Sequence, residues 1–270
     1  MQLEEFNSLA GQGFNRIPLV KEVLADLETP LSLYVKLSQA FGEKNTYLLE
    51  SVLGGERFGR FSFIGLPAKT IIRTVGTPSA PVNEVLTDGK VVESSTDNPL
   101  DFVDAYFKRF KVAVQAGLPR FCGGLAGYFG YDTVRYIESR LAKYDLPDEL
   151  GLPDIQLMLT EELAVIDNVA GKIYLIVYAD PSIADSFEKA QDRLKELLTC
   201  LGKPANIPAS LPSAKTDLIR KFKTADFEDA VRKTKEYILA GDCMQVVIGQ
   251  RISKPFTDSP LALYLSLIHI

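Results

Sequence analysis

The sequence predicts an α+β fold, because segments with helical and strand patterns follow one another without strict alternation. Apolar residues recur at helical spacing in residues 29–41, 98–110, 182–201 and 224–239. Other short apolar runs are bounded by glycine, proline and polar residues, a pattern typical of strands. Strict alternation would favour a doubly wound parallel sheet, so we expect a mixed sheet with helices packed against it.

The two helices of the first half each begin with a capping residue followed by proline. Thr29 precedes Pro30, and Asn98 precedes Pro99. A side-chain oxygen at the first position accepts a hydrogen bond from a free backbone N–H, and proline suits the first helical position. The candidate strands in this half are residues 46–49, 60–64 and 70–75.

Strand pairs joined by short turns are also predicted. Asp88 and Gly89 separate residues 84–87 from residues 90–93, and this dipeptide is a strong hairpin signal. A second pair of strands and the turn between them are predicted at residues 163–167, 172–178 and 168–171.

Residues 123–127 are rich in glycine but lack the spacing of a dinucleotide-binding motif, and no lysine follows to grip a phosphate. We interpret them as a strand whose small residues let a neighbouring backbone approach closely. Tyr128, Phe129 and Tyr131 would then fill the space beside it.

The chain is predicted to contain two regions joined by a linker. Residues 1–201 form the first region and end in an amphipathic helix that begins at Ser182. Residues 202–216 carry three prolines and are interpreted as the linker. Residues 217–265 begin the second region, and residues 266–270 are interpreted as a non-native tail left by truncation or read-through.

The second region is predicted to hold one helix and one strand. Asp226 is the expected N-cap of the helix at 224–239, and Gly241 is its expected left-handed end. The strand at 244–251 would place Gln245 among apolar neighbours, a pattern that by itself favours an ordinary strand with one satisfied amide. Two elements cannot bury a core alone, so this region should lean on the first or be loosely held.

Composition argues against several classes of protein. A formal net charge of −5, a pI near 5.2 and the lack of a basic cluster argue against a nucleic-acid-binding surface. The first residues do not resemble a secretory signal, and no apolar stretch has the length needed to span a bilayer. Three separated cysteines and a single histidine, His269, favour reduced thiols in a cytoplasmic protein over a disulfide framework or a zinc site.

Two charged clusters are interpreted without a catalytic role. Arg57 and Arg60 flank aromatic residues and are expected on a solvated or salt-bridged face. Glu161 and Glu162 are adjacent, so in a strand they would point to opposite faces and could not act as a carboxylate pair.

Three motifs resemble anthranilate synthase component I, the large, chorismate-binding subunit. They are residues 47–65, 123–132 and 241–251, and they occur in the order found in that family. The likeness extends from about Phe14 to about Tyr264. It implies that the chain has the mixed sheet and helices of that family. It also implies that the chain is an N-terminal fragment that stops early in the catalytic domain.

The resemblance implies that the whole enzyme catalyses the first step of tryptophan biosynthesis. A separate glutamine amidotransferase subunit, component II, supplies ammonia, which adds to chorismate. Loss of the ring hydroxyl and elimination of pyruvate then give anthranilate. In that family Mg²⁺ binds the substrate carboxylate through glutamates that align beyond the end of this chain. We therefore expect these 270 residues to be inactive alone.

The resemblance also implies site residues. By itself, the stretch at 48–51 indicates an apolar strand end that runs into a polar turn. In anthranilate synthases this stretch belongs to the pocket for the inhibitor tryptophan, so Ser51 is an inhibitor-binding candidate with Leu49 and Glu50 as neighbours. Gln245 stands where related enzymes that add water to chorismate carry a lysine, so we expect it to line the active site.

Two alternatives remain open. Aminodeoxychorismate synthase component I shares the fold and chemistry but makes a folate precursor, and residues 48–51 and 59–65 favour the tryptophan branch instead. The other alternative is a non-catalytic module that binds an amino acid or docks onto a subunit. Whether the natural gene continues past Tyr264 would separate an enzyme from such a module.

Overall fold

The computed structural model describes residues 1–51, 59–143, 148–206 and 216–268. The chain divides into two units, Met1–Asn206 and Ile207–Ile270. Helices and strands both occur, and every pair of named strands is antiparallel, which confirms the predicted α+β fold. The finer division of the chain stays a prediction. It assigns residues 1–201 to the first region, 202–216 to the linker, 217–265 to the second region and 266–270 to a non-native tail.

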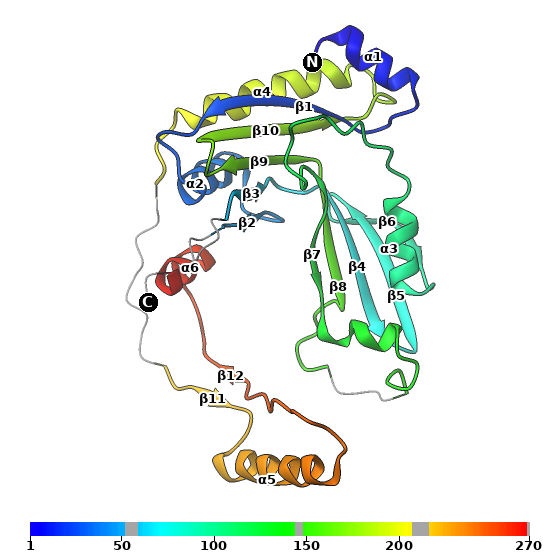
Figure 1. Ribbon diagram of the computed structural model, residues 1–270, viewed down its shortest axis with the longest axis vertical. Coiled ribbons are helices and arrows are strands. Elements are labelled where there is room, and N and C mark those ends of the chain that lie inside the picture. Colours follow the sequence, from blue (N-terminus) through cyan, green and yellow to red (C-terminus); the bar gives the residue numbers. More distant parts are fainter. Residues whose placement is uncertain (52–58, 144–147, 207–215, 269–270) are drawn as a thin grey trace. The chain divides into compact units, whose positions relative to one another are not determined.

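The first sheet of unit Met1–Asn206 has five strands in the order β1-β10-β9-β3-β2 (Figure 1). The strands are β1 (Ile17–Leu24), β2 (Tyr47–Leu49), β3 (Phe61–Gly65), β9 (Glu162–Asp167) and β10 (Lys172–Ala179). The hairpin β9–β10, with its turn at the predicted place, pairs with β3 on one side and β1 on the other. Segments more than a hundred residues apart in the chain thus lie side by side.

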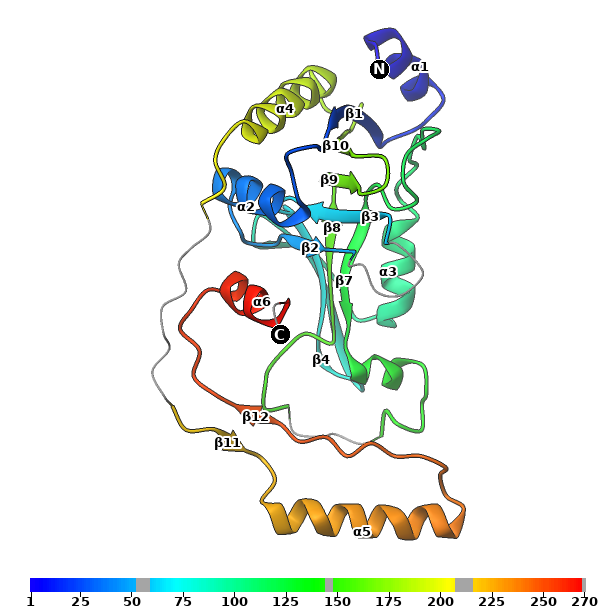
Figure 2. The same ribbon diagram turned by 60° about the vertical axis from the view of Figure 1, so that its left-hand side comes forward.

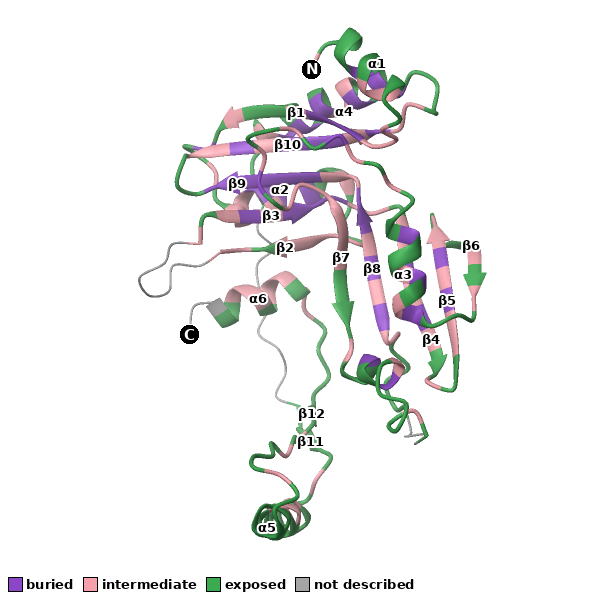
Figure 3. Cartoon of the chain, turned by 45° about the vertical axis from the view of Figure 1, so that its right-hand side comes forward, coloured by how far each residue is buried: buried purple, intermediate pink, exposed green. Residues whose placement is uncertain are grey.

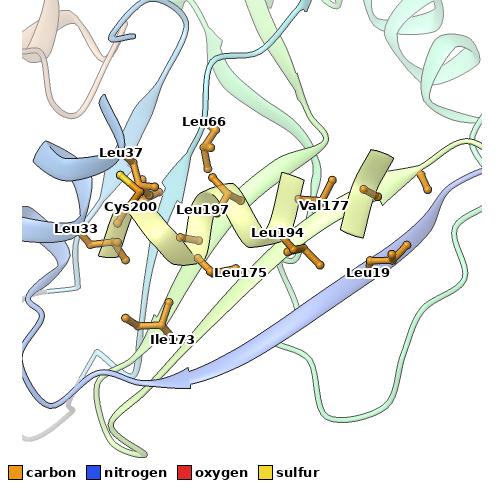
Figure 4. Close-up of a cluster of buried hydrophobic side chains, with 14 of the residues drawn as sticks. Leu19, Leu33, Leu37, Leu66, Ile173, Leu175, Val177, Leu194, Leu197 and Cys200 are labelled. Atoms are coloured by element: carbon orange, nitrogen blue, oxygen red, sulfur yellow. The ribbon is translucent and has the colours of Figure 1, made fainter. Parts of the chain in front are cut away.

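Three helices cover one face of this sheet: α1 (Leu3–Gly11), α2 (Pro30–Phe41) and α4 (Ser186–Leu201). Figure 4 shows the core between them, in which Leu33 and Leu37 from α2 and Leu194, Leu197 and Cys200 from α4 meet the side chains of the strands. Thr29 caps α2 as predicted, within a reciprocal capping box with Ser32.

Helix α4 begins at Ser186 and not at Ser182. The carboxylate of Asp180 accepts hydrogen bonds from the backbone N–H of Ser182 at 2.9 Å and from its hydroxyl at 2.7 Å. This local turn competes with the helix for the same backbone groups and delays its start.

The other face of the first sheet is also covered, because Leu163, Val165 and Ile176 pack with partly buried residues that include Leu118 and Phe121. Burial on both faces explains why β9 and β10 are nearly continuous apolar runs instead of alternating ones. Figure 3 shows β9 as the most uniformly buried of these strands.

The second sheet has the order β6-β5-β4-β8-β7. Its strands are β4 (Thr70–Thr77), β5 (Ala80–Thr87), β6 (Lys90–Ser95), β7 (Gly124–Phe129) and β8 (Ile155–Thr160), and the 3₁₀ helix η1 (Tyr131–Tyr136) follows β7. The predicted hairpin at Asp88 and Gly89 is confirmed by the pairing of β5 with β6. Helix α3 (Pro99–Phe107), capped by Asn98 as predicted, lies against this sheet (Figure 2). Its Phe102 and Tyr106 complete a second core.

The glycine-rich segment forms β7, as predicted. A Cβ atom at Gly127 would lie 2.0 Å from the carbonyl oxygen of Gln156 on β8. Close approach of the two backbones therefore requires glycine at this position.

Three elements of this unit, α1, β1 and β8, were not predicted from the sequence. Strand β1 contains a proline, and its charged residues Lys21 and Glu22 are adjacent instead of alternating with apolar ones. Strand β8 carries Gln156 among apolar residues. Their place in the sheets depends on partners from distant parts of the chain, which a local pattern does not report.

The second unit contains β11 (Ile219–Arg220), α5 (Thr224–Ala240), β12 (Ile252–Ser253) and α6 (Pro260–Ile268). The prediction of one helix and one strand for this region was therefore wrong, because α6 and the two short strands were not expected. Gly241 ends α5 in the left-handed conformation, as predicted. Asp226 was expected to cap α5 and does not, because the helix already begins at Thr224 and Lys223 occupies the cap position. Helix α5 has no buried residue (Figure 3).

The strand expected at residues 244–251 is absent, which corrects the prediction. Regular pairing in the described part of this unit is limited to Ile219–Arg220 with Ile252–Ser253. A strand exists only where its N–H and C=O groups find a neighbouring strand, and residues 243–250 are paired with no strand among the described residues. The carbonyl of Arg251, just before β12, accepts the backbone N–H of Lys221 at 3.0 Å. None of the described helices combines the length and apolar character needed to cross a membrane.

Candidate functional site

The predicted inhibitor-binding residues lie at the end of β2, one of the two edge strands of the first sheet. Leu48 and Leu49 pair with Ile64 and Phe63 of β3. Because neighbouring strand residues point to opposite faces, Leu48 packs against the core whereas Leu49 is 54% exposed. Glu50 and Ser51, which follow directly, are half-buried.

Ser51 is held by the neighbouring strand after β2 itself has ended. Its backbone N–H donates a hydrogen bond of 3.1 Å to Oγ of Ser62 on β3. Ser62 is fully buried, and its Oγ also accepts a hydrogen bond of 3.2 Å from Nδ2 of Asn168. Asn168 begins the turn between β9 and β10, so three separate segments meet at Ser51.

An ion pair lies beside this polar cluster. The guanidinium of Arg60 donates to both carboxylate oxygens of Asp167, at 3.0 Å and 2.7 Å to Oδ2 and 3.1 Å to Oδ1. The carboxylate also accepts the backbone N–H groups of Val169 and Ala170. These bonds, chiefly those from Arg60, hold the pKa of Asp167 below its ordinary value although burial opposes the charge.

The Asp167 carboxylate gives a pH-dependent prediction. Its pKa is lower in the folded than in the unfolded chain, so its contribution to stability is full above the unfolded pKa of about 3.9 and is lost as pH falls through the lower folded value. We expect Asp167→Asn to lower the free energy of unfolding by about 1–3 kcal/mol at pH 7. This difference should shrink below about pH 4, as measured by urea unfolding followed by circular dichroism.

Asp192→Asn is the matched control, because Asp192 lies on an exposed part of α4 and pairs with the exposed Lys195. It should change stability by less than about 0.5 kcal/mol. An Asp167→Asn effect that is equally small, or independent of pH, would contradict the assigned role.

The described members of the two charged clusters form ion pairs. Glu161 pairs with Arg16 and Glu162 pairs with Arg193, each at 2.8 Å, so the two carboxylates have different partners and form no catalytic pair. Arg60 forms the predicted salt bridge, whereas Arg57 lies outside the described residues.

A groove of about 1220 Å³ is present in the unit Met1–Asn206. Its charged lining residues include Lys44, Lys69, Asp88 and Lys189 besides Arg73, Arg193, Glu161 and Glu162. Leu49, Glu50 and Ser51 are not part of its lining, so the groove does not coincide with the predicted tryptophan site.

Gln245 lies in the other unit and is exposed, without regular secondary structure around it. A different glutamine, Gln250, has the hydrogen-bond partners that were expected for the side-chain amide of Gln245. Oε1 of Gln250 accepts the backbone N–H of Phe222 at 2.9 Å, and its Nε2 donates to the carbonyl oxygen of Phe222 at 3.1 Å. Gln250 therefore closes the short β11–β12 ladder, a role that only its position beside Phe222 reveals.

The described residues form no Mg²⁺ site of the kind that the resemblance implies for the whole enzyme. Within the described ranges, no group of three or more His, Cys, Asp or Glu side chains is arranged to hold a metal ion. The residues present in this part of the chain therefore do not fit that cofactor.

The model of the family described as chorismate binding enzyme matches residues 68–270, so the chain belongs to this enzyme family. More particularly, it is 52% identical over 267 residues to anthranilate synthase component 1 of Neisseria meningitidis serogroup B, covering 98% of this chain and 53% of that protein. It is 48% identical over 273 residues to anthranilate synthase component 1 of Pseudomonas putida, covering 99% of this chain and 54% of that protein. These relatives confirm the resemblance indicated by the three motifs, and the chain spans about half of their length.

A solved structure agrees with the fold. The crystal structure of anthranilate synthase component I from Streptococcus pneumoniae TIGR4 matches with a TM-score of 0.59 and 24% sequence identity. The match covers 91% of this chain and 51% of that one.

Proposed function

We propose that this chain acts as part of anthranilate synthase component 1, a cytoplasmic carbon–oxygen lyase of tryptophan biosynthesis. The observation that carries the proposal is the 52% identity to the Neisseria meningitidis protein of that name over 98% of this chain. The substrate is chorismate, consistent with membership in the chorismate binding enzyme family.

The proposed reaction adds ammonia to the chorismate ring, with loss of the ring hydroxyl and elimination of pyruvate. The name component 1 of the relatives supports a second component, which we propose to be the glutamine amidotransferase that supplies ammonia. The proposed Mg²⁺ ligands, like most catalytic groups, are contributed from outside these residues. The chain alone is therefore proposed to be inactive.

Tryptophan is the proposed feedback inhibitor, bound beside Leu49, Glu50 and Ser51. The chemistry of the β2 end supports this assignment, because an exposed leucine adjoins polar groups that can meet the ammonium and carboxylate of an amino acid. Binding there would favour an inhibited conformation without blocking chorismate directly.

The experiment that tests the proposal identifies the product of the complete enzyme, meaning a protein of the relatives' full length that carries this chain. With chorismate, ammonia and Mg²⁺, it should release anthranilate, detected by fluorescence and chromatography, and rescue growth of a tryptophan auxotroph that lacks component 1. Release of aminodeoxychorismate without anthranilate would overturn the proposal, and so would chorismate left unconsumed.

Gln245 is proposed to orient ligands in the active site of the complete enzyme. An amide forms hydrogen bonds but cannot remove a proton near neutral pH, whereas a lysine in an apolar site can act as a general base. Ammonia is already a nucleophile, so Gln245→Lys should lower kcat/KM for ammonia by about 10²-fold and admit traces of water addition. Gln250→Lys is no suitable control because of its bonds to Phe222, so Gln12→Lys on the exposed end of α1 serves instead. Unchanged anthranilate formation by Gln245→Lys would place Gln245 outside the reacting centre.

A further inference from the structure

We infer that Ser62, Asn168 and Gly59 are positioning residues that set the place of Ser51 and thereby the response to tryptophan. The inference rests on the proposed function of Ser51 as an inhibitor contact. It extends the site to β3 and to the β9–β10 turn, which is more than a hundred residues away from Ser51 in the sequence.

Ser62 supplies the first contact. It is a fully buried hydroxyl between two aromatic residues of β3, Phe61 and Phe63, and a buried hydroxyl needs hydrogen-bond partners. A serine oxygen has two lone pairs, so it can accept from Ser51 N–H and from Asn168 Nδ2 at the same time. The hydroxyl therefore links the end of β2 to the β9–β10 turn.

Asn168 supplies the second contact, because its side-chain amide carries two N–H donors. It donates to Oγ of Ser62 at 3.2 Å and to the carbonyl oxygen of Gly59 at 3.3 Å. Its own backbone is fixed by a bond of 2.8 Å from its N–H to the carbonyl oxygen of Arg60. One side chain thus fixes Gly59 directly and Ser51 through Ser62.

Gly59 determines how much room Ser51 has. A Cβ atom at position 59 would lie 2.4 Å from both Cβ and Oγ of Ser51. The backbone of Gly59 is not in the left-handed region, so an alanine there conflicts with the neighbouring serine and not with its own conformation. Gly59→Ala is therefore a small change that acts on Ser51 directly.

A purely structural role would lower stability without altering recognition of tryptophan, so two readouts are needed. The first uses the 270-residue chain and measures hydrogen exchange of the Ser51 amide by NMR. Because this N–H donates to a buried hydroxyl, Ser62→Ala should accelerate its exchange by at least tenfold relative to the wild type. Exchange unchanged by Ser62→Ala would show that the contact does not hold Ser51 and would overturn the inference.

The second readout is tryptophan inhibition of the complete enzyme. Asn168→Ala and Gly59→Ala should each raise the tryptophan concentration for half-inhibition about tenfold above that of the wild type. Each inhibition curve is normalised to the uninhibited rate of the same variant. Two matched controls should leave it unchanged. Gly11→Ala adds a methyl group where nothing lies within 4 Å, and Asn15→Ala removes side-chain bonds to Arg109 and Lys111 that are remote in sequence from Ser51.

The outcomes separate this inference from the proposed function. If Ser51→Phe relieves inhibition while Asn168→Ala and Gly59→Ala respond like the wild type, Ser51 binds tryptophan and the positioning role is overturned. If Ser51→Phe also responds like the wild type, the proposed site fails and the inference fails with it. Should Asn168→Ala not fold, Gly59→Ala decides alone.

Discussion

Ser51→Phe in the complete enzyme is expected to raise the tryptophan concentration for half-inhibition by at least 10²-fold. The physical reason is volume, because Gly59 already touches the serine so closely that even one methyl group on it would collide. A phenyl ring at position 51 cannot share this space with an indole ligand. Differential binding to the inhibited state would disappear, and with it the coupling between tryptophan and catalysis.

The measurement is a set of inhibition curves at several tryptophan concentrations, with initial rates of anthranilate formation followed by fluorescence. Ser51→Thr is an informative companion, since it keeps the hydroxyl and adds only one methyl group. Ser94→Phe, on the edge strand β6, provides a serine-to-phenylalanine control away from β2. Wild-type inhibition curves for Ser51→Phe would show that tryptophan binds elsewhere.

The second large effect concerns the 270-residue chain expressed alone, which is expected to form no detectable anthranilate from chorismate, ammonia and Mg²⁺. Enzymes accelerate reactions by typically 10⁶-fold or more through groups held in fixed geometry, so loss of that geometry removes measurable turnover. In this chain Gln245 is exposed and α5 has no buried residue. Neither feature provides a fixed catalytic wall.

The positive control is the full-length relative from Neisseria meningitidis, assayed under the same conditions. Circular dichroism of the 270-residue chain should show the helices and sheets of the unit Met1–Asn206, so that inactivity is not confused with global unfolding. Turnover above a no-protein blank by the folded chain would show that these residues contain a working active site.

Elements whose signals are local could be predicted from the sequence. The Asp88-Gly89 hairpin depends on a two-residue turn, and the starts of α2 and α3 depend on a capping side chain followed by proline. The same holds for Gly241, which ends α5 because glycine adopts the left-handed conformation without strain. The three motifs were likewise sufficient to indicate the family.

Features that depend on partners distant in the chain could not be predicted and became visible in the three-dimensional structure. Residues 244–251 have the composition of a strand, but a strand needs a neighbour for its backbone groups. In the described part of the second unit, strand pairing is confined to Ile219–Arg220 with Ile252–Ser253. The surroundings of Ser51 also depend on residues that are distant in the sequence. No local pattern relates Ser51 to Asn168, because their contact through Ser62 arises from the pairing of β3 with β9 and from the turn that follows. Sequence patterns report the preferences of neighbours along the chain, whereas this site is assembled by hydrogen bonds across the sheet.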